Sequence, residues 1–202
     1  MKVTRVVIFL LIALAVGRVR AGEAITMSST ADPLDPPRIE MAAESAYLLG
    51  FFNNPHGYEI GAEFLTARVR WGVIQNDSWL RGYQQFYLLA MVEPIFRGVE
   101  NHYFGMNFGL RYNFVRPNTR WIPYVSGGVG LGWIDSNAAV GGSQGQDFTF
   151  NILSAAGISY RWNDRWKVDA GILYEHLSNA GQSDPNPSLN LLGPQAAISY
   201  SF

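Results

Sequence analysis

The chain has 202 residues, of which 15 are basic, 16 are acidic, 48% are hydrophobic and none is cysteine. The lack of cysteine excludes disulfide bonds, cysteine-ligated zinc and thiol catalysis, and the lack of a basic surplus argues against a nucleic-acid partner. Only 15% of the residues are charged, whereas 14% are aromatic and 21 are glycine, which favours one all-β domain with an apolar exterior.

The first 21 residues predict an export signal. Lys2 and Arg5 give a positively charged start, and an apolar run over residues 6–16 follows. This run is too short for a transmembrane helix, which needs about 20 residues. We expect cleavage after Ala21, with Ala24 as the alternative site.

The expected mature domain, residues 22–202, has 11 basic and 16 acidic residues once the four basic residues of the signal are removed, a formal charge of −5. It contains no apolar run long enough to span a membrane as a helix. Its first strands are expected near residues 38–52, 58–71 and 79–92. Neither face of these three segments is purely apolar, so their facing is left open.

Residues 104–114 show the alternation expected of a β-strand most clearly. One face carries only large apolar or aromatic side chains: Phe104, Met106, Phe108, Leu110, Tyr112 and Phe114. The other face carries glycine, asparagine and Arg111. Side chains two residues apart share a face, and a run of this length matches a tilted membrane strand of about 9–11 residues. Arginine among small polar residues favours a narrow polar lumen.

The same design is repeated to the end of the chain. Residues 121–133 have tryptophan at both ends, which resembles the aromatic girdles at the two membrane interfaces. A similar face follows over residues 148–160, and a polar turn leads into a strand from Trp166. The last strand ends at Phe202, and a terminal phenylalanine after alternating apolar residues resembles the C-terminal signal of bacterial outer-membrane barrels.

Eight strands result, and an even number suits a transmembrane barrel with both ends in the periplasm. Turns 115–120 and 162–165 are then periplasmic, whereas the longer segments 135–146 and 177–189 lie outside the cell. Side chains fill the interior of an eight-stranded barrel, so no open pore is expected. A water-soluble β-sandwich is the alternative fold.

His176 and Ser178 lie two residues apart on the apolar face of the strand that begins at Trp166. A base and a potential nucleophile on such a face suit a protein whose wall meets lipid and whose substrate is a lipid. If Trp166 lies opposite Tyr200 in the antiparallel last strand, Asn190 lies opposite His176 on the same face.

Residues 174–181, with 184–187 and Leu189-Asn190, resemble the PagL-type lipid A 3-O-deacylase family. Members of this family are eight-stranded outer-membrane barrels that hydrolyse an ester-linked acyl chain of lipid A. The resemblance implies Ser178 as the nucleophile and His176 as its general base. It also implies an oxyanion site formed by main-chain N–H groups of three residues, Asn179, Ala180 and Gly181.

The third catalytic position departs from the family, which has a glutamate where this chain has Asn190. An asparagine can fix a histidine tautomer by hydrogen bonding, but it cannot stabilise an imidazolium by charge, so a slower enzyme is expected. Asp184 in the loop is an alternative source of charge, whereas Glu175 faces the lumen. Outer-membrane phospholipase A is similar in its use of serine, histidine and asparagine, which keeps phospholipid open as a substrate.

Other motifs are interpreted as structural. Residues 141–145 match Gly-x-Ser-x-Gly, but a nucleophile elbow needs a following helix, and none is expected. His56 and His102 are expected to be solvated loop residues, and no metal or cofactor is predicted. A non-catalytic barrel that serves adhesion or envelope structure stays open as a function. The expected partner is lipid A or another outer-leaflet lipid, and a homodimer is not excluded.

Overall fold

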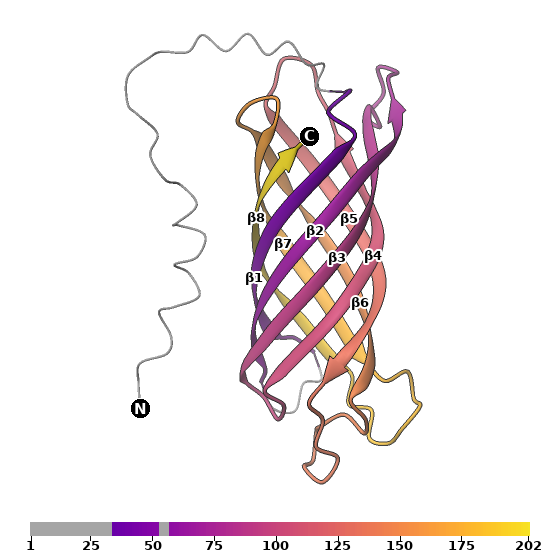
Figure 1. Cartoon of the computed structure of the whole chain (residues 1–202), viewed down its shortest axis with the longest axis vertical. Helices are drawn as coiled ribbons and strands as arrows, with labels where there is room; N and C mark the ends of the chain where they lie inside the picture. Colours follow the sequence, from indigo (N-terminus) through magenta and orange to yellow (C-terminus); the bar gives the residue numbers. More distant parts are fainter. Residues whose placement is uncertain (1–33, 53–56) are drawn as a thin grey trace, which may run out of the picture.

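The computed structural model describes residues 34–52 and 57–202, so the expected export signal and His56 lie outside the described part of the chain. Within that part, eight antiparallel strands close into one barrel, and β8 pairs with β1 (Figure 1). The strands are β1 (Ile39–Gly50), β2 (Glu59–Ile74), β3 (Gly82–Arg97), β4 (His102–Phe114), β5 (Trp121–Ile134), β6 (Phe148–Arg161), β7 (Trp166–Ser178) and β8 (Leu189–Ser201). Among these residues, no helix is long and apolar enough to cross a bilayer. The predicted eight-stranded antiparallel barrel is confirmed.

The bounds of β3 differ most from those that the sequence indicated. The strand begins at Gly82 and ends at Arg97, whereas residues 79–92 were expected. Its start is later because a turn at Ser78 takes up the first expected residues. Its end is later because Pro94 does not terminate the strand. The pairing with β2 continues past this proline with a register shift between Glu59, which pairs with Arg97, and Ile60, which pairs with Ile95.

Most of the outer wall of the barrel is apolar, with Ser45 and Glu63, which are hydrogen-bonded to each other on β1 and β2, among the exceptions. Large exposed side chains on it include Leu65, Phe86, Leu88, Phe108, Val129, Ile152 and Ile172. Aromatic pairs lie near both edges of this wall: the ring centroids of Trp121 and Tyr160 are 4.7 Å apart, and those of Trp133 and Phe148 are 5.6 Å apart. An apolar band between aromatic edges is the surface that a transmembrane barrel presents to lipid.

The two ends of the barrel differ in their connections. The loops 135–147 and 179–188 project from one end, at the bottom of Figure 1, which is called the loop end below. The turns 115–120 and 162–165 lie at the opposite end, called the turn end, together with the C-terminus. Longer loops at one end and short turns at the other match the usual orientation of such barrels, with the loop end outside the cell.

The lumen is filled by side chains along its length. Near the loop end its lining is mostly apolar and includes Leu48, Ile60, Leu89, Met91, Leu177 and Leu191, all buried, although the carboxyl groups of Glu93 and Glu175 are buried there as well. Apolar residues on the inner face explain why the facing of the first strands could not be assigned from alternation alone. In these strands, apolar side chains occupy both the lipid face and the lumen.

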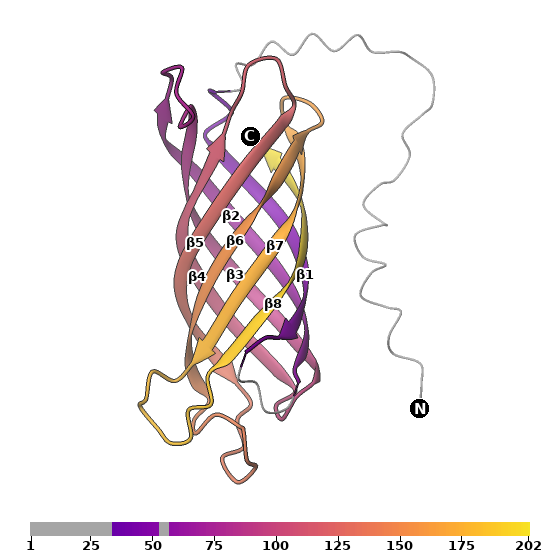
Figure 2. The same ribbon diagram turned by 180° about the vertical axis from the view of Figure 1, so that it is seen from behind.

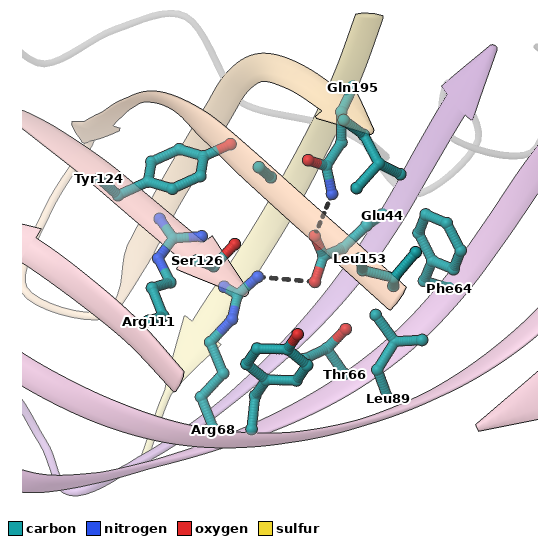
Figure 3. A pocket seen from close by; sticks show the side chains of 13 residues that line it. Glu44, Phe64, Thr66, Arg68, Leu89, Arg111, Tyr124, Ser126, Leu153 and Gln195 are labelled. Carbon is teal, nitrogen blue, oxygen red and sulfur yellow. Dashed lines mark hydrogen bonds and ion pairs between the residues drawn. The ribbon is translucent and has the colours of Figure 1, made fainter. Parts of the chain in front are cut away.

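Toward the turn end, a network of buried charges replaces the apolar lining. Arg68 contacts Glu40 at 2.8 Å and Glu44 at 2.6 Å, as Figure 3 shows in part. Arg111 contacts Asp169 at 2.8 Å, and Lys167 contacts Glu40. These pairs satisfy charges that would be costly to bury alone.

A cavity of about 30 Å³ lies beside this network, lined by residues that include Glu44, Arg68 and Tyr124 (Figure 3). It is large enough for two or three water molecules. In the described part of the chain, buried side chains surround this cavity on the inner face of the barrel.

Candidate active site

The β7–β8 hairpin carries the predicted residues on one face of the wall, and the two strands lie side by side in Figure 2. Trp166 pairs with Tyr200, and His176 pairs with Asn190, so the predicted register is confirmed. His176 and Ser178 are half-buried on the face that Trp166 shares, whereas Leu177 is buried in the lumen. The pair is therefore directed to the lipid side near the loop end.

His176 is held by the amide of Asn190. Its Nδ1 lies 2.9 Å from Asn190 Oδ1, and the Tyr174 hydroxyl donates to the same oxygen at 2.8 Å. An amide oxygen can only accept, so Nδ1 carries the hydrogen. The lone pair of Nε2 is then left for a substrate or a nucleophile, which is the tautomer that a general base requires.

Tyr174 is the contact that the sequence did not single out. It is the first residue of the stretch 174–181 that resembles the family, but no role was predicted for it, because by alternation it belongs to the lipid-facing aromatic side chains. Its hydroxyl nevertheless reaches diagonally across the hairpin, because its own partner in the register is Leu192 rather than Asn190.

Ser178 is the last residue of β7 and pairs with Phe150 of β6. Its side chain shares the outward face with His176, but in the described part of the chain no hydrogen bond joins Ser178 Oγ to the imidazole. Residues two apart on a strand lie about 6.6 Å from each other at Cα. Hydrogen bonds between catalytic groups are commonly long in ligand-free enzymes and shorten when substrate binds.

The loop after Ser178 is organised by the buried side chain of Asn179. Its Nδ2 donates to the carbonyl oxygens of Ser183 at 2.7 Å and Pro185 at 3.2 Å. Its main-chain N–H donates to Asn186 Oδ1 at 3.1 Å. These bonds fold residues 179–186 back on themselves, so Asn179 acts as an internal support of the loop.

The hydrogen bonds within this loop also use some of the main-chain N–H groups that were predicted as oxyanion donors. Gly181 N–H donates to Asn179 Oδ1 at 2.9 Å, and Asn179 N–H is also bonded within the loop. Among the three predicted donors, Ala180 N–H alone has no hydrogen bond within residues 34–52 and 57–202. Ala180 and Gly181 both have positive φ, 55° and 73°, which turns the chain sharply beside Ser178.

The loop between β5 and β6 supports the loop after Ser178. Gly145 N–H donates to the Pro185 carbonyl at 2.6 Å, and Ser183 Oγ donates to the Gly145 carbonyl at 3.1 Å. Gln146 Nε2 donates to Gln182 Oε1 at 2.9 Å. The position of the loop after Ser178 therefore depends on a segment about 40 residues earlier in the chain.

The remaining candidate residues from the sequence lie outside the His176–Asn190 contact. Ser143, the serine of the Gly-x-Ser-x-Gly match, is buried and donates to Glu100 at 2.8 Å, with no helix after it. His102 is the first residue of β4 rather than a loop residue, because it pairs with Pro94 of β3. Glu175 is buried in the lumen, and Asp184 is exposed and forms no ion pair with His176 in the described chain. In the same part of the chain, no three acidic or histidine side chains gather to hold a metal ion.

Comparison with known proteins finds one matching family model and solved structures of similar fold. The family model described as lipid A 3-O-deacylase (PagL) matches residues 56–199. The crystal structure of Neisserial surface protein A (NspA) is similar, with a TM-score of 0.59 and 16% identity over 81% of this chain and 97% of that one. The crystal structure of the outer membrane enzyme PagL is similar, with a TM-score of 0.54 and 16% identity over 78% of this chain and 97% of that one. None of the curated protein sequences matches the chain. At such identities, the two structures show a common fold.

Proposed function

Since the chain belongs to the lipid A 3-O-deacylase (PagL) family, we propose that it is an ester hydrolase of the bacterial outer membrane that removes the 3-O-linked acyl chain of lipid A. The observation that carries this proposal is the His176–Asn190 contact of 2.9 Å on the lipid-facing wall, two residues from Ser178. A base on this wall meets its substrate inside the membrane, where the acyl chains of lipid A are.

Ser178 acts as the nucleophile in this proposal. His176 Nε2 takes the proton of Ser178 Oγ as the oxygen attacks the ester carbonyl. The negative charge moves to the carbonyl oxygen, to which Ala180 N–H donates in this proposal. The ester C–O bond then breaks, and His176 returns the proton to the departing sugar hydroxyl.

A water molecule completes the cycle. His176 takes a proton from this water as it attacks the acyl group on Ser178, and it returns that proton to Ser178 Oγ as the acyl–oxygen bond breaks and the fatty acid leaves. Asn190 keeps the imidazole in the required tautomer but supplies no charge to the imidazolium. Relative to a family member with glutamate at this position, a lower turnover number is expected.

Phospholipid hydrolysis is the second candidate, because the serine, histidine and asparagine set is the one that outer-membrane phospholipase A uses. Mass spectrometry of lipid A separates the candidates. Cells that express the wild type should lose one hydroxyacyl mass from lipid A, whereas His176→Ala and Ser178→Ala should leave lipid A intact. His102→Ala is the matched control, since this exposed histidine lies at the same end of the barrel on β4 and should not affect the reaction.

Folding of each variant is checked by its heat-dependent migration in SDS gels. Unchanged lipid A with a folded wild-type barrel contradicts the lipid A proposal. Phospholipid analysis of the same cells then decides between the second candidate and a barrel without catalytic activity.

A further inference from the structure

Two hydrogen bonds meet on one oxygen at the candidate site. Asn190 Oδ1 is 2.9 Å from His176 Nδ1 and accepts from the Tyr174 hydroxyl at 2.8 Å. Tyr174 is half-buried on the lipid-facing wall, where water does not compete for these bonds. The reaction as proposed uses His176 and Asn190 but leaves the tyrosine without a role.

An asparagine at the third position creates a difficulty that a carboxylate does not. The two ends of an amide differ, and rotation by 180° would turn its NH₂ group toward the histidine. His176 Nδ1 would then have to accept, and the hydrogen would move to Nε2. In that tautomer Nε2 cannot take the proton of Ser178. A carboxylate has two equivalent acceptor oxygens, so either orientation selects the active tautomer.

We infer that Tyr174 is a positioning residue, which holds the oxygen of Asn190 toward His176 and so keeps the histidine in its base form; this rests on the proposed function. A phenol is a better donor than acceptor, because its lone pair is delocalised into the ring, and it therefore favours the amide oxygen over the amide nitrogen. The position of the amide nitrogen supports the same orientation of Asn190. Its Nδ2 lies 3.5 Å from the Ser188 carbonyl oxygen, which can only accept a hydrogen bond. In this chain, tyrosine and asparagine together set the tautomer that glutamate sets alone in the family.

A double-mutant cycle tests this inference through turnover of lipid A. In the wild-type background, Tyr174→Phe should lower kcat about tenfold, the effect of one hydrogen bond, and leave KM nearly unchanged. In the Asn190→Glu background, the same substitution should change kcat by less than about twofold, because a carboxylate needs no orienting donor. Tyr160→Phe, on the outer face of β6, is the matched control and should have no effect in either background.

An equal loss of kcat in both backgrounds would overturn the inference, since it would mark a tyrosine that only packs. The absence of any loss would overturn it as well.

Nitrogen-15 NMR of the histidine rings provides a readout that does not depend on activity. The chain has three histidines, so single substitutions of His56 and His102 assign the signals. His176 should carry its hydrogen on Nδ1 in the wild type, and Tyr174→Phe should introduce the Nε2–H tautomer. A single Nδ1–H form in both proteins would refute the role of Tyr174. If the wild type fails to hydrolyse lipid A but shows this tautomer change, the proposed function fails and the positioning role stands.

Discussion

Gly145 and Asp184 lie so close that a β-carbon at position 145 would stand 2.5 Å from the carbonyl carbon and oxygen of Asp184. These atoms belong to backbone, so they cannot turn aside as a flexible side chain would. The contact joins the loop between β5 and β6 to the loop that follows Ser178. Any side chain at position 145 must therefore move one loop relative to the other.

Gly145→Ala should reduce lipid A deacylation by about 10- to 100-fold, because displacements of about 1 Å at a reacting group cost that much. The barrel itself should fold as before, since the contact is confined to the loop end. Gly141→Ala is the matched control in the same loop, where a β-carbon meets no atom within 4 Å. Equal activity of the two variants would show that the loop between β5 and β6 does not position the site.

Asn179→Ala tests whether the buried amide holds the loop after Ser178. The substitution removes the acceptor of Gly181 N–H and the donor to the Ser183 and Pro185 carbonyls. Hydrogen exchange at Gly181 should become faster by about 10- to 100-fold, equivalent to roughly 1.5–3 kcal/mol. Exchange in the barrel strands should stay the same.

The control for this variant is Asn137→Ala, which removes an exposed asparagine side chain from the neighbouring loop. Slow exchange at Gly181 in Asn179→Ala would mean that the main-chain bonds alone maintain the loop, and that Asn179 is free for another role.

The register of the last hairpin could be predicted from the sequence because its charged residues all lie on one face of β7, although Leu173 and Leu177 share that face. One face of β7 carries Trp166 and Ile172, and the other carries Lys167 and Asp169, so a shift by one residue would expose charges to lipid. Parity then places His176 opposite Asn190. The first strands lack this contrast, since β2 carries Glu63 on its outer face and Ile60 on its inner face, and only the closed barrel shows which side faces the lumen.

The hydrogen bonds of the site could not be predicted in the same way. Tyr174 follows the pattern of a lipid-facing aromatic residue, and its bond to Asn190 depends on a diagonal approach across the hairpin. The free N–H of Ala180 results from bonds of Asn179 within an irregular loop. Neither contact follows from the alternation of apolar and polar residues, because both arise from loop and side-chain conformations that alternation does not constrain.

The buried charge network gives a prediction for stability. Arg68 contacts Glu40 and Glu44 at 2.8 and 2.6 Å, and Asp169 at 3.7 Å. Arg68→Met would leave these carboxylates without their shared partner and should cost about 3–5 kcal/mol. Thermal unfolding in detergent, followed by the gel shift of the folded barrel, measures this loss.

Arg116→Met is the control for Arg68, because this exposed arginine at the turn end donates to the carbonyls of Ser78 and Trp79 rather than to a carboxylate within residues 34–52 and 57–202. It should change stability by less than about 1 kcal/mol. If both variants unfold at the same temperature, water in the neighbouring cavity must solvate the carboxylates that Arg68 leaves.

Asp135 gives a prediction for pH at the loop end. Burial raises the pKa of this carboxyl, but hydrogen bonds from the Asn101 side chain and from the N–H groups of His102 and Asn101 outweigh that effect and hold the pKa below its usual value. A carboxylate whose pKa is lowered by folding stabilises the folded state above its unfolded pKa, and the contribution is lost as the pH falls through the folded pKa. His102, whose Nδ1 lies 3.7 Å from Asp135 Oδ2, is the charged neighbour when it is protonated.

Hydrogen exchange of the Asn101 and His102 amides should therefore be slow at neutral pH and, after correction for intrinsic rates, lose protection as the pH falls below about 4. Asp135→Asn should remove this dependence, because an amide does not ionise in this range and can still accept from one N–H. Protection that falls equally in both proteins would assign the transition to another carboxylate. The contact joins the start of β4 to the end of β5, and β6 separates it from the strand that carries Ser178. Since the amide of Asp135→Asn keeps part of this contact, lipid A hydrolysis by the variant should match the wild type at neutral pH.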